Sequence, residues 1–290
     1  MLEKVYPQES GRMGEDHYLN VFADFIKRHA DHYDLVIDIG GNDGSLANRF
    51  NSAYEVIDPS VNCGIEEVIL TRFKFTHKLY VSSHTLEHVE DPNLFISKVS
   101  KSLRYEDTVA LQVPSLECLV EDFRFDQIHH QHIHYFSERS LTSLLAKHGL
   151  EVIACEFNHD HWGAVMVVAK PGKGHASGKK LERLDVLFSR FIFTTNMGTW
   201  RYKLRNGGFV AFGASPMLPV MDYHLPLEKA DFIADDDRSK GGFWRNKVVT
   251  SDYSLKDRDV VITASSKVST RKLTSKALSL GARNVYTPFQ

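Results

Sequence analysis

The sequence has only three cysteines among its 290 residues, and they stand far apart as Cys63, Cys118 and Cys155. They form no C-x-x-C pair, which argues against a zinc knuckle, and their odd number argues against a disulfide framework. The formal net charge is -2 and no long basic run occurs, so nucleic acid is not expected as a partner. We therefore expect a protein of the reducing cytoplasm.

Long apolar runs are also missing. A run such as 164–169 (AVMVVA) is far too short to cross a bilayer, and the N-terminal residues contain no hydrophobic region typical of a secretory signal. We therefore expect no membrane span. Hydrophobic residues make up 42% of the sequence and charged residues 25%, which is typical of a globular protein, here with enough chain for two domains.

Apolar runs predict six strands in the first part of the chain, with helical patterns between most of them. The strands are expected at 35–39, 54–57, 78–82, 108–113, 151–157 and 162–169, and the helices at 14–30, 44–50, 92–103 and 138–148. Strands that alternate with helices predict a parallel sheet. Only a short polar segment separates the last two strands, so these two are expected to pair antiparallel at one edge.

The segment 171–178 (PGKGHASG) predicts a linker, and a helical pattern follows it. Further on, strands are expected at 209–213, 231–234, 259–263 and 284–286, with helices from Pro216 and at 267–280. The predicted fold class is therefore α/β, with two Rossmann-like domains. The expected boundaries are 1–172 for the first domain, 173–206 for a linker and connecting helix, and 207–290 for a smaller α/β domain.

The segment 34–46 (DLVIDIGGNDGSL) predicts a strand, a glycine turn and the start of a helix. Asn42 takes the place of the second glycine of G-x-G-x-x-G, the pattern that cradles a pyrophosphate. Asp38 and Asp43 flank the turn, and carboxylates repel a pyrophosphate but attract a cation. S-adenosylmethionine, which carries a sulfonium and an ammonium group, therefore fits this turn better than NAD. A turn without any ligand is the alternative interpretation.

Asp58 ends the next apolar run, 18 residues after Gly40. This is close to the spacing of about 20 residues at which an acid reaches the ribose hydroxyls of an adenosyl ligand. We therefore expect the glycine turn around the methionine moiety, Asp58 at the ribose, and the end of the third strand nearby. The predicted cofactor-binding residues are Asp38, Gly40, Asn42, Asp43, Gly44, Asp58, Ser83 and His84.

Histidines concentrate in the segment 126–136 (DQIHHQHIHYF), where four of the fifteen lie within six residues. Histidine titrates near neutrality, so it can take a proton from a hydroxyl group or from a carbon next to a ketone. A zinc site is one rival interpretation, because alternate histidines share a face if the segment is extended. The sequence offers no obvious carboxylate or cysteine partner, so no metal is predicted. Purely structural histidines are the other rival.

We take proton transfer and substrate binding as the main interpretation of these histidines. The predicted catalytic residues are His132, His130 and His84, and the predicted substrate-binding residues are His129, His134, Tyr135 and Ser215. His88, at the end of the same strand as His84, is explained equally well by bonds to local backbone groups.

As a set, these segments resemble the bacterial S-adenosylmethionine-dependent sugar C-methyltransferases that act on nucleotide-linked deoxysugars. The similar segments are 36–46 (VIDIGGNDGSL), 57–60 (IDPS), 83–89 (SHTLEHV), 129–137 (HHQHIHYFS), 212–215 (FGAS), 232–235 (FIAD) and 259–262 (DVVI). The resemblance runs from about residue 6 to the end. It implies a class I methyltransferase domain followed by a second Rossmann-like domain, with a sugar, nucleotide sugar or glycan precursor as the small-molecule substrate.

The sequence departs from that family at several points. It has no counterpart of the cysteine-rich zinc-binding module with which the family usually begins, and 216–218 (PML) stands where a lysine usually helps to hold the substrate. His129 and Gln131 replace the tyrosine and glutamate of the family's catalytic stretch. Glutamine cannot act as a base, so proton removal is left to a histidine and O-methylation is as well supported as C-methylation.

Two other classes of protein stay open. One is a non-catalytic or regulatory subunit with a methyltransferase-like fold, which the altered catalytic stretch favours. The other is a nicotinamide-dependent α/β enzyme, which the missing G-x-G-x-x-G pattern disfavours. The sequence does not fix the oligomeric state, and a homo-oligomer is one of the options.

Overall fold

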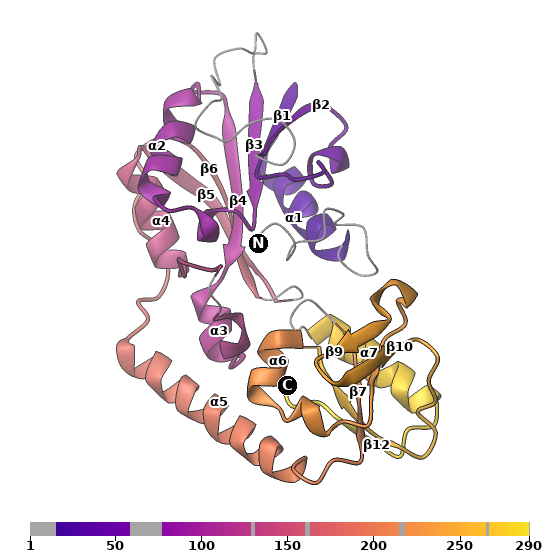
Figure 1. Ribbon diagram of the computed structural model, residues 1–290. Helices are drawn as coiled ribbons and strands as arrows, with labels where there is room; N and C mark the ends of the chain where they lie inside the picture. Colours follow the sequence, from indigo (N-terminus) through magenta and orange to yellow (C-terminus); the bar gives the residue numbers. More distant parts are fainter. Residues whose placement is uncertain are drawn as a thin grey trace. The chain divides into compact units, whose positions relative to one another are not determined.

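The computed structural model describes residues 16–58, 77–128, 131–159, 163–214, 218–264 and 267–289 (Figure 1). Contacts divide them into two compact units. The first unit consists of the described residues within Met1–Cys118, His130–His159 and Gly163–Leu181, and the second includes those within Leu119–His129 and Glu182–Gln290. The boundaries at 172 and 206 stay a prediction. Among the helices described, none has both the length and the apolar character needed to cross a membrane.

The first unit is built on a six-stranded sheet in the order β2-β1-β3-β4-β6-β5. The strands are β1 (Leu35–Ile39), β2 (Ala53–Ile57), β3 (Lys78–Ser83), β4 (Thr108–Pro114), β5 (Leu150–Asn158) and β6 (Ala164–Pro171). The first four strands pair in parallel, and β6 runs antiparallel to both β4 and β5. The predicted strands and their antiparallel edge pair are therefore confirmed.

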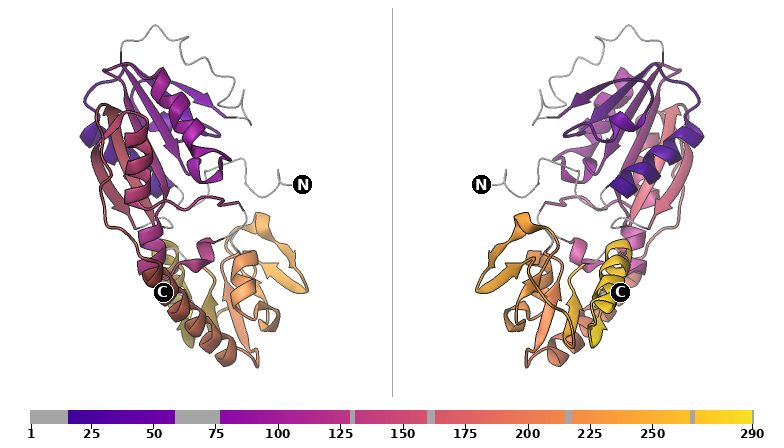
Figure 2. Two further views of the ribbon diagram at one scale, coloured as in Figure 1. Left: turned by 90° about the vertical axis from the view of Figure 1, so that its left-hand side faces the viewer. Right: turned by 90° about the vertical axis from the view of Figure 1, so that its right-hand side faces the viewer.

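Helices cover both faces of this sheet, as the two views of Figure 2 show. They are α1 (Asp16–His29), α2 (Pro92–Ser102) and α4 (Glu138–Lys147), whereas α3 (Leu116–Glu121) follows β4 and crosses the division between the two units. Alternate residues of β1 face opposite sides, because side chains alternate along a strand. Val36 packs in the core with Phe22 of α1, whereas Ile37 packs in a separate core with Ile96 of α2 and Leu141 of α4.

The segment predicted as a helix at 44–50 is different in the structure. It forms a turn followed by a short 3-10 helix, Ala47–Arg49. Gly44 has a φ of +77°, which a right-handed helix does not allow, and Asp43 accepts a hydrogen bond from the backbone N–H of Ser45 at 3.0 Å. Local side-chain bonds of this kind compete with helix formation. Further 3-10 helices are Leu86–His88, Phe125–Gln127, Leu227–Lys229 and Arg238–Lys240.

The second unit contains its own six-stranded sheet, in the order β12-β11-β7-β8-β10-β9. Its strands are β7 (Phe209–Phe212), β8 (Ile233–Ala234), β9 (Gly242–Trp244), β10 (Lys247–Thr250), β11 (Asp259–Ile262) and β12 (Asn284–Tyr286), and its helices include α5 (Arg183–Lys203), α6 (Leu218–His224) and α7 (Lys267–Ser279). All neighbouring strands are parallel except β9, which pairs antiparallel with β10. The α/β class is thus confirmed, and the β9–β10 hairpin was missed.

The strand order of the first unit marks the position where a ligand is expected. From β1 the chain moves outward to β2, and it then returns across β1 to form β3 on the other side. The strand order therefore reverses between β1 and β3. In open parallel sheets, ligands bind at such a reversal, beyond the carboxyl ends of the strands. The residues after Ile39 and after Ser83 therefore lie at the expected ligand-binding edge.

A buried ion pair holds the start of β3. Lys78 and Asp107 are 3% and 0% exposed, and the Nζ atom of Lys78 lies 3.5 Å from Oδ2 of Asp107. The same carboxylate accepts hydrogen bonds from the backbone N–H groups of Lys78 and Arg104, both at 2.8 Å. Asp107 therefore neutralises a buried ammonium group and satisfies two backbone donors.

We expect Asp107→Ala to lower the free energy of unfolding of this unit by about 3–5 kcal/mol, because it leaves a buried charge unpaired. Urea unfolding followed by circular dichroism measures the loss, and hydrogen exchange of the β3 and β4 amides assigns it to this unit. Glu106→Ala, at an exposed neighbouring residue, is the control and should change the stability by less than about 0.5 kcal/mol. Equal stability of the two variants would contradict the assignment.

Candidate functional site

The turn after β1 depends on glycine because it runs close to neighbouring side chains. Gly40 has a φ of +74°, and a Cβ atom there would lie 2.2 Å from Oγ1 of Thr85. A Cβ atom on Gly41 would lie 2.4 Å from Cγ of Asp38. Both separations are too short for any larger residue. The turn therefore brings bare backbone against the end of β3 and against the acid of β1.

Asp38 lies beneath this turn and is 1% exposed. Its Oδ2 atom accepts a hydrogen bond from the backbone N–H of Ala47 at 3.2 Å, whereas its buried Oδ1 atom accepts none within the described residues. Burial raises the pKa of Asp38 to about 7; the bond from Ala47 opposes this shift, and the negative charges of Asp58 and Asp43 add to it. A cation placed here would stabilise the ionised carboxylate.

Asp58 connects the ends of β1 and β2. Its Oδ2 atom accepts a hydrogen bond from the backbone N–H of Asn42 at 3.1 Å, and Gly40 donates to the carbonyl oxygen of Ile57 at 2.8 Å. Asn42 adopts a φ of +49°, which aims its N–H group at Asp58. The structure thus brings together the predicted cofactor-binding residues of the two segments, which are Asp38, Gly40, Asn42, Asp43, Gly44 and Asp58.

The end of β3 lies beside this turn. Ser82 donates a hydrogen bond to the carbonyl oxygen of Ile39 at 2.8 Å, which ties the ends of β3 and β1 together. Ser83 accepts a hydrogen bond from Nε2 of the buried Gln112 at 3.0 Å. His84 has a φ of +53° and donates its backbone N–H to the carbonyl oxygen of Gln112 at 2.9 Å. Both predicted residues of this strand therefore lie at the ligand-binding edge.

Glu87 was not predicted as a site residue, yet it is the centre of a histidine group. It is 1% exposed, and its Oε1 atom lies 3.3 Å from Nδ1 of His84 and 3.8 Å from Nε2 of His88. Burial favours a higher pKa, but the hydrogen bond from His84 and the charges of His84 and His88 outweigh it and lower the pKa of Glu87. The buried carboxylate is therefore ionised at neutral pH.

His132 completes this group. It is 4% exposed, and its ring centroid lies 5.0 Å from that of His88 and 6.4 Å from that of Tyr135. Nδ1 of His88 contacts the carbonyl oxygen of Gln131 at 2.8 Å, and a carbonyl only accepts, so Nδ1 carries a proton. We call Glu87, His84, His88 and His132 the histidine centre.

A metal ion is an alternative occupant of part of the histidine centre. The donor atoms of Glu87, His88 and His132 all lie within 4.8 Å of one another. Two imidazoles and a carboxylate are a ligand set that zinc accepts. The carboxylate partner that the sequence analysis lacked is therefore Glu87. A signal that could have found it is the spacing of His84, Glu87 and His88 at positions i, i+3 and i+4, because residues three or four apart lie on the same side of a helical turn.

The remaining predicted residues are less central. His134 is partly exposed and places Nε2 3.4 Å from the carbonyl oxygen of Glu90, and Tyr135 is partly exposed beside His132. Residues 131–135 form no regular strand. His129, His130 and Ser215 lie outside the described residues.

Comparisons with known proteins agree with this geometry. Residues 16–154 match a family model described as a methyltransferase domain. The C-methyltransferase NovU of Streptomyces niveus is 30% identical over 159 residues, which is 48% of this chain and 38% of the relative. The chain thus spans well under half the length of that curated relative. Over residues 16–154 the chain is therefore similar to methyltransferase domains, and these residues lie in the first α/β unit.

Solved structures similar to this one include two methyltransferases with bound S-adenosylhomocysteine. The 1,6-didemethyltoxoflavin-N1-methyltransferase of Burkholderia thailandensis is 14% identical, with a TM-score of 0.43, and the match covers 54% of this chain and 79% of that one. The magnesium protoporphyrin IX methyltransferase of Synechocystis is 12% identical, with a TM-score of 0.40, and the match covers 59% of this chain and 93% of that one.

The raised pKa of Asp38 predicts a pH-dependent stability. The pKa of Asp38 is about 7 in the folded state and 3.8 in the unfolded state, so folding takes up a proton when the pH lies between these two pKa values. The free energy of unfolding therefore falls as the pH rises from about 4 to 7. Asp38→Asn should lack this fall, which amounts to at most about 4 kcal/mol.

Urea unfolding of the wild type and Asp38→Asn across this pH range measures the effect. Asp24→Asn, which changes an exposed acid on α1, is the matched control and should follow the wild type. Parallel pH curves for the wild type and Asp38→Asn would show that the buried carboxylate does not titrate in this window.

Proposed function

We propose that this chain transfers a methyl group from S-adenosylmethionine to a sugar, a nucleotide sugar or a glycan precursor. The observation that carries the proposal is that the acid-lined glycine turn and the histidine centre lie at the same edge of one sheet. The hydrogen bond from Ser82 to Ile39 and the close approach of Gly40 to Thr85 join the two parts. These contacts support a methyl-donor site close to a proton acceptor.

The residues of the turn fit this cofactor. The buried Oδ1 atom of Asp38 has no hydrogen-bond donor within the described residues, and a cationic amine or sulfonium would satisfy its charge. Asp58 supplies a second carboxylate, already oriented by the N–H of Asn42, which suits ribose hydroxyls. The pyrophosphate of a nicotinamide cofactor would instead meet the negative charges of Asp38, Asp43 and Asp58, which argues against that alternative.

The protein's own contribution is alignment and proton transfer. When bound, S-adenosylmethionine supplies a methyl group on a positively charged sulfur. The glycine turn holds the donor in line with the acceptor, which removes much of the entropic cost of the reaction. His132 takes the proton that the acceptor loses, from an oxygen or a carbon atom. The ionised Glu87, whose donor atom lies within 4.8 Å of that of His132, stabilises the resulting imidazolium charge.

The class of substrate rests on the segments 83–89 and 129–137, which resemble the sugar methyltransferases. The relative named as a C-methyltransferase supports transfer to carbon, whereas Gln131, in the place of a glutamate, equally allows transfer to oxygen. The same replacement, together with His129, favours a second candidate function, a methyltransferase-like subunit without catalysis of its own. Such a subunit would leave every acceptor unmethylated unless a partner enzyme were added.

Calorimetry with S-adenosylhomocysteine tests the cofactor site. We expect Asp58→Ala to weaken binding by about 1.5–3 kcal/mol, the usual contribution of a hydrogen bond to a charged group. Asp24→Ala changes an exposed acid on α1 and is the matched control, with an expected affinity equal to that of the wild type. An absence of binding heat in the wild type would overturn the cofactor assignment.

A pH profile tests the base. Transfer of a labelled methyl group to a panel of sugars and nucleotide sugars identifies an acceptor, and the rate with saturating cofactor should then rise from about pH 6 to pH 8, because an ordinary histidine is neutral only above a pKa of about 6.5. His132→Ala should lose this rise and most of the rate. His175→Ala, at an exposed histidine of the linker, is the control.

The same profile measured with EDTA separates the alternatives. A rate that collapses with the chelator and recovers with a divalent ion would assign Glu87, His88 and His132 to a metal ion instead. A flat, chelator-insensitive profile with methyl transfer shown to be rate-limiting would remove the histidine base.

A further inference from the structure

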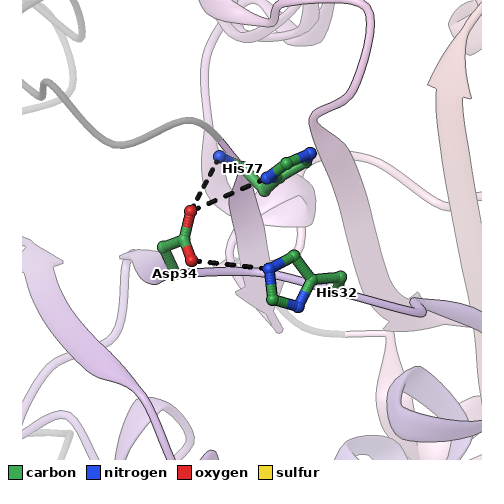
Figure 3. A group of neighbouring side chains, drawn as sticks. All are labelled: His32, Asp34 and His77. Atoms are coloured by element: carbon green, nitrogen blue, oxygen red, sulfur yellow. Dashed lines mark hydrogen bonds and ion pairs between the residues drawn. The ribbon is translucent and has the colours of Figure 1, made fainter.

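A second group of metal-ligand side chains lies at the other end of β1, away from the glycine turn. His32 and Asp34 precede β1, and His77 precedes β3 (Figure 3). Leu35 pairs with Lys78 in the parallel ladder, so the residues just before them, Asp34 and His77, are neighbours as well. Two hydrogen bonds fix this pair: Asp34 N–H to the carbonyl of His77 at 2.9 Å, and His77 N–H to Oδ2 of Asp34 at 3.2 Å.

The Asp34 carboxylate faces both imidazole rings and directs one oxygen toward each, as Figure 3 shows. Its Oδ1 atom is 3.5 Å from Nε2 of His32, and its Oδ2 atom is 3.7 Å from Nδ1 of His77. The two ring centroids are 5.1 Å apart. One donor atom from each residue can be chosen so that all three lie within 4.8 Å of one another. Two nitrogens and one oxygen are therefore near enough to be ligands of a single ion.

The spacing of these atoms suits a metal ion better than hydrogen bonds. Nitrogen-to-oxygen hydrogen bonds measure about 2.7–3.2 Å, which is shorter than both ring contacts. Ligand atoms held at about 2.0–2.2 Å around a tetrahedral zinc ion lie roughly 3.3–3.6 Å apart. The two nitrogen-to-oxygen separations, 3.5 and 3.7 Å to different oxygens of Asp34, are near this range, so small side-chain rotations would bring the three ligands around one ion. In addition, the Nδ1 atom of His77 is buried and makes no hydrogen bond within the described residues. A bound ion would satisfy it.

We propose that His32, Asp34 and His77 bind a divalent transition metal ion, zinc being the ion that this ligand set fits best. Imidazole ligands select zinc and its transition-metal neighbours over magnesium and calcium, which prefer all-oxygen sites. The His32 side chain is 70% exposed, so the ion is reached from solvent and retains a position for water. The ion joins the segments that lead into β1 and β3 and lies on residues separate from the proposed methyl-transfer site.

Zinc titration of the metal-free protein against a chromophoric chelator tests the site. We expect His32→Gln and His77→Gln each to weaken zinc binding at this site at least about tenfold. If His77→Gln does not fold, His32→Gln alone decides the test, because the exposed His32 makes no contact that the fold requires. His175→Gln is the matched control and should bind zinc as the wild type does.

His132→Gln separates this site from the histidine centre. The proposal holds if zinc binding survives His132→Gln and is lost in His32→Gln. It is overturned if His32→Gln and His77→Gln bind zinc as tightly as the wild type, if His132→Gln alone abolishes binding, or if magnesium competes with zinc at equal concentration. None of these readouts depends on methyl transfer, so failure here leaves the proposed function untouched.

Discussion

The parallel register between β1 and β3 is the constraint on which both ends of the first unit depend. It pairs Leu35 with Lys78 and Asp38 with Val81. At the carboxyl end, this register brings the glycine turn against Thr85 and close to the histidine centre, and at the amino end it sets Asp34 beside His77. A slip of one residue would turn every side chain of the strand to the opposite face and separate both groups.

The two buried acids of the ligand-binding edge have opposite environments. Glu87 is paired with histidines, and its pKa is lowered, whereas Asp38 has no cationic partner within the described residues, and burial raises its pKa to about 7. Buried charge is costly unless it is compensated. The protein thus supplies the counter-charge for Glu87 itself but supplies none for Asp38 within the described residues, and the proposed cationic cofactor would provide it. In active sites, two acids with pKa values shifted in opposite directions typically take different roles in the reaction.

The sequence predicted what depends on local pattern and missed what depends on distant pairing. The four central strands of the first sheet, β1, β3, β4 and β6, were found because their apolar runs are buried along nearly their whole length. The helix expected at 44–50 failed because Gly44 needs a positive φ and Asp38 captures the N–H of Ala47. The Glu87 carboxylate was overlooked because its role appears only when a 3-10 turn gathers His84 and His88. Asp34 and His77 are 43 residues apart and meet only through the sheet.

Under the proposed function, the position of Glu87 bears on the choice between carbon and oxygen as the methyl acceptor. Gln131, within the segment that resembles a catalytic stretch, cannot remove a proton, and an imidazole alone is a weak base for a carbon acid. A buried carboxylate beside the imidazoles strengthens them, because the charge they gain on taking a proton is neutralised in a site where water screens little. Glu87 brings that carboxylate from the end of β3. The replacement at position 131 therefore does not by itself exclude carbon methylation. Carbon and oxygen acceptors differ in how strongly removal of their proton depends on the Glu87 carboxylate.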